Sequence, residues 1–144
     1  MDSSPIEFFS EDCVFSLPLQ NLVSVWMQDT AKQYGCMLEN ISIIFCSDAY
    51  LLALNQEHLQ HDFYTDILTF PIHEPGSKWL KGDIFISIDR VKENAQTLDV
   101  SFSDELHRVI IHGVFHLIGF DDQKEEEEAQ MRLLEDGALQ LRGF

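Results

Sequence analysis

Short apolar runs alternate along this chain with longer segments of helical periodicity, and this alternation predicts a domain that contains both strands and helices. The predicted strands lie at residues 6–9, 41–46, 67–72 and 83–88. The predicted helices run from Pro18 to Gly35, from residue 49 to about residue 58, after Asp89, from 104 to 118 and from 125 to 139. The sum is about four strands and five helices, which is an α+β chain.

Capping residues set several of the predicted helix boundaries. Asp89 and Ser103 are predicted N-caps, because their side chains can accept hydrogen bonds from the first turn of the helix that follows. Gly119 is predicted to end the helix that begins after Ser103. In the first helix, Leu19 and Leu22 fall on the apolar stripe and are expected to face the core.

The length of 144 residues fits about one domain, and no linker, repeat or low-complexity stretch divides the chain. We therefore expect a single domain over residues 1–144. Nine Lys and Arg against 25 Asp and Glu give a net charge of −16, so long-range attraction to nucleic acid or an anionic membrane is disfavoured and an RNA partner must be met locally. In the last predicted helix we expect the glutamates in water and Met131, Leu134 and Ala138 facing inward.

The three cysteines indicate a reducing compartment. Cys13, Cys36 and Cys46 lie among apolar neighbours and lack the spacing of a metal site, so we interpret them as reduced core thiols. The first ten residues do not resemble a signal peptide, and no stretch approaches the roughly 18 apolar residues that a membrane span needs. The expected location is the cytoplasm, without a membrane partner.

His112 and His116 lie four residues apart on a predicted helix, so their imidazoles project from one face about one turn apart. This spacing suits two ligands of one metal, although by itself it also occurs in histidines without one. After Gly119 the chain can fold back over the pair and bring the following acids near it. The composite pattern is H-x3-H-x5-D, which ends at Asp122.

Two neighbouring features limit the chemistry of this pair. Zinc peptidases with an H-E-x-x-H motif use the Glu after the first His as general base, and Gly113 occupies that position here. Glu105 and Arg108 lie on roughly the same helical stripe as the histidines. They either stand beside the metal ligands or form a solvated helix face.

The string His112-Gly-Val-Phe-His-Leu-Ile-Gly-Phe-Asp121 resembles the signature of the YbeY family, metal-dependent endoribonucleases of rRNA maturation, which reads H-G-x-x-H-L-x-G-[YF]-D-H. Residues 54–55, 65–71 and 82–84 resemble further segments of the family, in the same order. The resemblance implies a mixed sheet packed by helices, a zincin-like helix that carries a Zn²⁺ site, and cleavage of single-stranded RNA. It also implies roles in small-subunit rRNA maturation and ribosome quality control, with RNA and the ribosome as partners and no DNA.

The chain departs from the family signature at the third metal ligand, where Asp122 stands in place of histidine. A carboxylate oxygen binds zinc at a distance similar to that of an imidazole nitrogen, so the resemblance assigns His112, His116 and Asp122 as the ligands. The extra negative charge should raise the pKa of metal-bound water, and sets of two histidines and one carboxylate occur in both zinc and iron sites. Asp121 either orients a ligand or competes with Asp122.

A second departure is Leu59, which occupies the position of a family arginine. An arginine beside the metal would pair with phosphate and stabilise developing charge. The candidate replacements are His58, His61, Arg90, Lys92 and Arg108. Of these we name Arg90 and Arg108 as candidate substrate-binding residues. Glu105 is the candidate acid or base. The alternative function is a ribosome-associated binding factor with weak or no catalysis and a structural metal.

Overall fold

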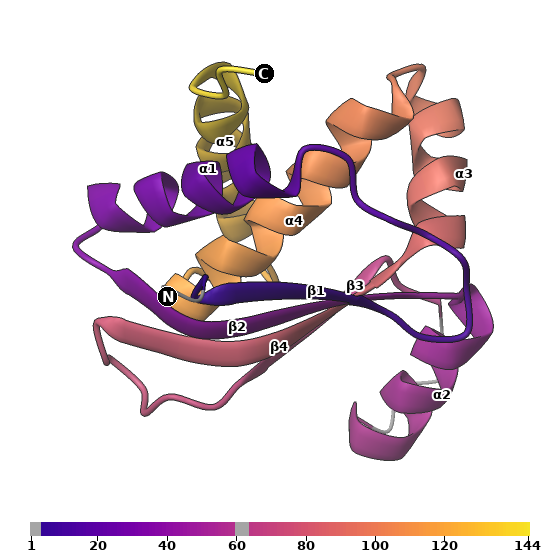
Figure 1. Cartoon of the computed structure of the whole chain (residues 1–144), viewed down its shortest axis with the longest axis horizontal. Coiled ribbons are helices and arrows are strands. Elements are labelled where there is room, and N and C mark those ends of the chain that lie inside the picture. Colours follow the sequence, from indigo (N-terminus) through magenta and orange to yellow (C-terminus); the bar gives the residue numbers. More distant parts are fainter. Residues whose placement is uncertain (1–3, 60–63) are drawn as a thin grey trace.

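The computed structural model describes residues 4–59 and 64–144 and shows one α+β domain, in which helices pack on a four-stranded sheet (Figure 1). The strands are β1 (Ile6–Ser10), β2 (Met37–Cys46), β3 (Ile67–Pro71) and β4 (Trp79–Ser87). The helices are α1 (Gln20–Gln33), α2 (Asp48–Leu59), α3 (Ile88–Leu98), α4 (Phe102–Ile118) and α5 (Glu125–Gln140). Within the described residues the predicted fold class and the numbers of strands and helices are confirmed.

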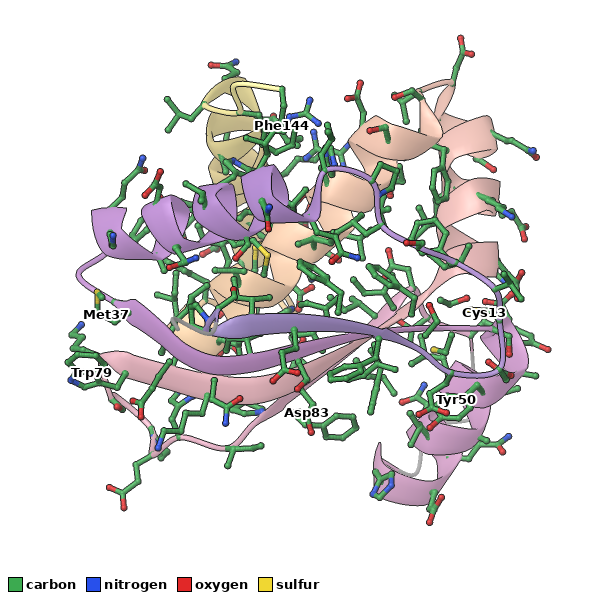
Figure 2. The ribbon with its side chains drawn as sticks, viewed as in Figure 1. Cys13, Met37, Tyr50, Trp79, Asp83 and Phe144 are labelled. Carbon is green, nitrogen blue, oxygen red and sulfur yellow. The ribbon has the colours of Figure 1, made fainter. Side chains whose placement is uncertain are left out.

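The sheet is mixed, with strand order β1-β2-β4-β3. The pairs β1–β2 and β2–β4 are parallel, whereas β3 runs antiparallel to β4. In this register Met37 is the partner of Trp79, and the two exposed side chains lie side by side at the same end of the sheet (Figure 2). Because β3 is the last strand in the order, it is an edge strand and pairs only with β4 among the described residues.

The main core lies between the sheet and helix α4. Val114 and Phe115 of α4 are fully buried in one apolar cluster with Ile43 of β2 and Ile84 of β4. Helices α1 and α5 contribute to the same cluster, whereas α2 packs on the opposite face through a smaller one that contains Leu51 (Figure 1). Burial of an aliphatic side chain contributes about 1.5–3 kcal/mol, so this contact fixes α4 on the sheet.

Two strands begin earlier than predicted. Strand β2 begins at Met37, where the prediction began at residue 41, and β4 begins at Trp79, where the prediction began at residue 83. The added residues include the exposed Glu39 and Lys81, which form an ion pair at 3.4 Å. Charged side chains on the open face of the sheet hide the strand signal, because the apolar alternation is interrupted there.

Three details of the helix boundaries were wrong. Helix α4 is capped by Ser101, which accepts from the N–H of Asp104, and not by Ser103. Helix α3 is capped by Ser87, and Asp89 instead accepts from the N–H of Asp48. At the start of α1, Leu19 adopts a left-handed conformation (φ 59°), and the helix begins at Gln20.

The apolar face of α1 also differs from the prediction. Leu19 and Leu22 are exposed, and the buried face is formed by Val23, Trp26 and Met27. The cysteines Cys36 and Cys46 are buried and Cys13 is half-buried, and all three are free thiols. No helix among the described residues has the length and apolar character needed to cross a membrane.

Buried His107 predicts a specific acid sensitivity. Burial, followed by the neighbouring Arg142 guanidinium, lowers the pKa of His107 to about 4. Because the folded pKa is below the unfolded value, stability is complete above about pH 6.5 and is lost as the pH falls towards 4. Between pH 7 and 4.5, wild type should lose about 2 kcal/mol more unfolding free energy than His107→Gln in urea titrations. Equal losses in the two proteins would contradict this assignment.

Candidate metal centre

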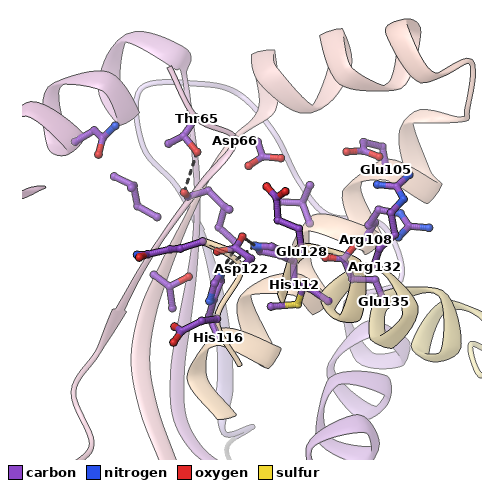
Figure 3. A pocket seen from close by; sticks show the side chains of 18 of the residues that line it. Thr65, Asp66, Glu105, Arg108, His112, His116, Asp122, Glu128, Arg132 and Glu135 are labelled. Atoms are coloured by element: carbon purple, nitrogen blue, oxygen red, sulfur yellow. Dashed lines mark hydrogen bonds and ion pairs between the residues drawn. The ribbon is translucent and has the colours of Figure 1, made fainter. Parts of the chain in front are cut away.

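Three side chains converge beside the C-terminal half of α4: His112, His116 and Asp122 (Figure 3). The histidines share one face of α4, and Gly119, at φ 124°, ends the helix and turns the chain back towards them. The His112 Nε2 atom lies 2.9 Å from His116 Nε2 and 3.2 Å from Asp122 Oδ2. His116 Nε2 lies 3.5 Å from the same carboxylate oxygen.

The second nitrogen of each imidazole is held by an acceptor. His112 Nδ1 lies 2.6 Å from Glu135 Oε2, and His116 Nδ1 lies 3.0 Å from the backbone oxygen of Phe120. Each Nδ1 must therefore carry the proton, which leaves a lone pair on each Nε2. Two lone pairs 2.9 Å apart repel unless a proton or a cation lies between them.

The spacing of the three ligand atoms fits a tetrahedral ion. Two atoms that each lie about 2.0–2.1 Å from a tetrahedral zinc ion are about 3.3 Å apart. The three measured separations, 2.9, 3.2 and 3.5 Å, bracket this value. This group could hold a metal ion with little movement of its side chains, as the sequence pattern predicts.

The electrostatics of the pair favour positive charge at His112. Burial lowers the pKa of His112, but the hydrogen bond and charge of Glu135, together with the charge of Asp122, outweigh it, and the net shift is upward. Burial and the neighbouring His112 lower the pKa of His116. The carboxylates around the pair thus stabilise one added positive charge between the two imidazoles.

Glu135 of α5 is a functional residue that our reading of the sequence missed. It is buried and bridges α4 and α5, because Oε2 contacts His112 while Oε1 accepts from Arg108 Nη1 at 2.9 Å. Arg108 also donates to Asp136. We expected the glutamates of this helix in water, but Glu135 lies four residues after Met131 on the buried stripe. The sequence signal for this role was a single acidic residue on the helix stripe that also carries Met131 and Ala138.

The three ligands line a cleft of about 830 Å³ between β3 on one side and α4 and α5 on the other (Figure 3). Its walls include both acids and bases. Besides the ligands, the charged lining residues are Asp66, Glu105, Arg108, Asp121, Glu128, Arg132 and Glu135. The cleft therefore holds the candidate metal ligands, titratable carboxyls and guanidinium groups within one concave surface.

The structure brings Glu105 and Arg108 to this cleft but not Arg90. Arg90 forms ion pairs with Asp48 at 2.8 Å and with Glu93 at 3.2 Å. Its guanidinium carbon lies 5.2 Å from the centre of the Tyr64 ring. Arg90 thus ties α3 to α2, and the prediction that it binds substrate in the cleft is not supported.

Two carboxyls in the cleft, the buried Glu105 and the half-buried Asp66, have raised pKa values. Burial raises the pKa of Glu105, and the charge of Asp66 raises it further. Burial also raises the pKa of Asp66, against the opposing charge of His112. Glu105 lies two helical turns before His112, about 10 Å along the axis of α4, so it does not reach the metal ligands directly.

Gly113 excludes a peptidase base at this position. A Cβ atom on Gly113 would lie 3.0 Å from Cδ1 of both Ile67 and Ile84. The position therefore faces the sheet, and a glutamate here would meet apolar side chains and not the cleft. The close approach of α4 to the sheet explains the glycine.

The position of the family arginine lies at the end of α2. Leu59 is the last residue of that helix, and its side chain and His61 fall outside the described residues. His58 is exposed, and its ring packs edge-on against Phe70 at 5.8 Å between centroids. His58 and Lys92 are not among the residues that line the cleft.

The comparisons with known proteins agree with this architecture. The chain matches the family model described as Endoribonuclease YbeY over residues 6–142, which spans every strand and helix of the fold. Proteins named Endoribonuclease YbeY from Cytophaga hutchinsonii and Porphyromonas gingivalis are 45% and 44% identical to it. The first alignment covers 100% of both chains, and the second covers 93% of this chain and 87% of the relative. The solution structure of a Thermotoga maritima protein, 25% identical, matches with a TM-score of 0.63 and covers 94% of this chain and 87% of that one.

The two adjacent aspartates provide a matched test of the third ligand. Asp122→Asn should lower the bound metal, measured by mass spectrometry of untagged protein, because an amide is a poor zinc ligand. Asp121→Asn should retain near-stoichiometric metal, since only Asp122 lies within reach of both histidines. The reverse result would assign the site to Asp121.

Glu135→Gln should weaken metal binding about 10- to 100-fold, because the amide no longer stabilises the Nδ1–H of His112 as a carboxylate does. Titration with a competing chelator gives the affinity. Asp136→Asn is the matched control, since Asp136 also contacts Arg108 but does not contact His112. Equal affinities for Glu135→Gln and wild type would show that this hydrogen bond does not tune the site.

Proposed function

Because the chain belongs to the YbeY family of endoribonucleases, we propose that it is a metal-dependent endoribonuclease that cleaves single-stranded RNA in small-subunit rRNA maturation and ribosome quality control. One observation carries the metal dependence: two imidazole nitrogens and a carboxylate oxygen converge within 4.8 Å of one another in the cleft. The spacing of these three atoms fits a divalent ion, and the Nδ1 atom of each imidazole is already held by an acceptor.

We propose Zn²⁺ as the bound ion, held by His112, His116 and Asp122. When bound, such an ion polarises a phosphate oxygen or lowers the pKa of a coordinated water. Glu135 and the backbone oxygen of Phe120 orient the two imidazoles for this role. The carboxylate ligand reduces the positive charge of the site relative to three histidines, which raises the pKa of coordinated water.

Glu105 remains our candidate for proton transfer, and Asp66 joins it. Both carboxyls line the cleft, and burial raises the pKa of both. A carboxyl with a raised pKa holds its proton closer to neutral pH and can deliver it to a leaving oxygen. Asp66 is the nearer of the two in electrostatic terms, because the charges of His112 and Asp122 act on it.

Arg108 remains our candidate for phosphate binding from the sequence, and Arg132 is a second one from the structure. Both line the cleft. Arg108 already pairs with Glu135 and Asp136, whereas no ion pair of Arg132 occurs among the described residues. Arg132 can therefore contact a phosphate without breaking an existing pair, in partial replacement of the family arginine at Leu59. Arg90 would need to leave its partners on α2 and α3.

The partners we propose are ribosomal RNA and the ribosome, with no DNA and no membrane. The net charge of −16 means that RNA contacts are made locally in the cleft. The cytoplasm is the location that we propose, because ribosomes mature there and the three free thiols suit a reducing compartment.

A second candidate function follows from Leu59. A chain without the family arginine has fewer groups to stabilise charge during phosphodiester cleavage. Such a protein would bind ribosomal RNA through the same cleft and hold a structural metal without turnover. The number of RNA molecules cleaved per protein separates the two functions.

The test is cleavage of a 5′-labelled unstructured RNA by metal-loaded protein. We expect several products per protein, loss of cleavage with a chelator, and loss of both metal and cleavage in His116→Ala. His107→Gln, a change in a buried histidine outside the cleft, should retain cleavage at pH 7. Undiminished cleavage by metal-free His116→Ala would refute the site. Saturable RNA binding without turnover in wild type would favour the binding factor.

A further inference from the structure

The free edge of β3 forms part of the cleft wall. The N–H of Ser87 donates to the oxygen of Asp66, and the N–H of Ile72 donates to the oxygen of Lys81. Since hydrogen-bonded pairs alternate in an antiparallel ladder, the backbone groups of 66, 68, 70 and 72 face β4. The N–H and C=O groups of Ile67 and Thr69 therefore point away from β4.

Proline at position 71 agrees with this assignment. Pro71 is the third outward-facing residue of β3, and a proline is tolerated where the missing N–H would face away from the sheet. Ile67, Thr69 and Pro71 all line the same cleft as His112 and His116. The outward backbone groups thus lie in the wall of the candidate active site.

These groups have spare hydrogen-bonding capacity. Among residues 4–59 and 64–144, no group accepts a hydrogen bond from the N–H of Ile67 or Thr69, and the only donor to their oxygens is Thr65 Oγ1, at 3.4 Å from the Ile67 oxygen. The Thr69 hydroxyl is also buried without a partner in this part of the chain. An edge strand whose outward N–H and C=O groups are not used by the protein is a template for an external hydrogen-bonding partner, so this edge is suited to one.

The pattern of the edge selects the kind of partner. It presents donors and acceptors in alternation, whereas a phosphate group offers only acceptors and would be repelled by the carbonyls and by Asp66, Glu105 and Glu128 in the same cleft. The Watson–Crick edge of a nucleobase offers a donor next to an acceptor. An uncharged backbone edge is therefore suited to a base, while the phosphate is left to an ion held by His112, His116 and Asp122 and to Arg132.

We propose that the free edge of β3, through the backbone of Ile67 and Thr69, hydrogen-bonds to the Watson–Crick edge of an RNA base beside the cleaved phosphate. This inference rests on the proposed ribonuclease function and adds a base-binding subsite to it. A base in a duplex has that edge occupied by its partner strand. The edge of β3 thus gives a physical reason why the cleft accepts unpaired nucleotides.

The test compares two RNA oligonucleotides that differ only at this edge. N3-methyluridine has lost the N3 donor and screens the neighbouring oxygen, but it keeps the charge and the stacking surface of uridine. Metal-loaded wild type should bind dye-labelled oligouridylate roughly 3- to 10-fold more tightly than the N3-methylated oligomer in fluorescence anisotropy. Cleavage of the two oligomers, measured in parallel, should follow the same order.

A backbone variant tests the protein side. Thr69→Pro deletes the outward N–H while leaving the ladder to β4 intact, and it should lose the preference for oligouridylate. Thr69→Val keeps the N–H but not the hydroxyl and should retain the preference. If Thr69→Pro does not fold, the wild-type comparison decides alone.

The outcomes separate this inference from the function on which it rests. Equal affinity of wild type for the two oligomers would overturn the β3 subsite, and cleavage of oligouridylate would then leave the ribonuclease function standing. A preference that persists unchanged in folded Thr69→Pro would also overturn the subsite. If wild type neither binds nor cleaves either oligomer, both proposals are overturned.

Discussion

The close approach of α4 to the sheet is the constraint on which the rest of the structure depends. Two glycines allow it: a Cβ on Gly82 of β4 would lie 3.0 Å from Cδ2 of Leu117 on α4, and a Cβ on Gly113 of α4 would lie 3.0 Å from Cδ1 of both Ile67 and Ile84. Because α4 packs closely on β3 and β4, the two histidines on its exposed face lie beside the β3 edge of the sheet. The candidate metal centre and the strand edge thus depend on the same packing of α4 on the sheet.

A buried set of charged and polar side chains links α4 to α5 beside the candidate site. The carboxylate of Glu135 is buried between the imidazole of His112 and the guanidinium of Arg108, so each of these three charged or polar groups has a partner. A buried carboxylate without such partners would cost several kcal/mol. The same contacts join α5 to α4, so the orientation of one imidazole and the docking of the last helix depend on each other.

Local signals in the sequence predicted the local features of this protein. Periodicity predicted the strands and helices, and the spacing of His112 and His116 predicted a shared face, because both depend on neighbours within one or two turns. The sequence did not predict the role of Glu135 or the ion pairs of Arg90, because each contact joins elements far apart in the chain. The free edge of β3 also required the strand order, which only the complete sheet reveals.

The position of the ligands along the chain has a consequence for folding. All three lie between residues 112 and 122, whereas Glu135, which orients His112, reaches the site only once α5 has docked. If an ion binds there, the denatured chain would still carry the candidate ligands at short range and would keep some affinity for it. Binding to the denatured state would reduce the stabilisation that the ion gives to the native state. The net gain would then reflect the orientation of His112 that α5 adds.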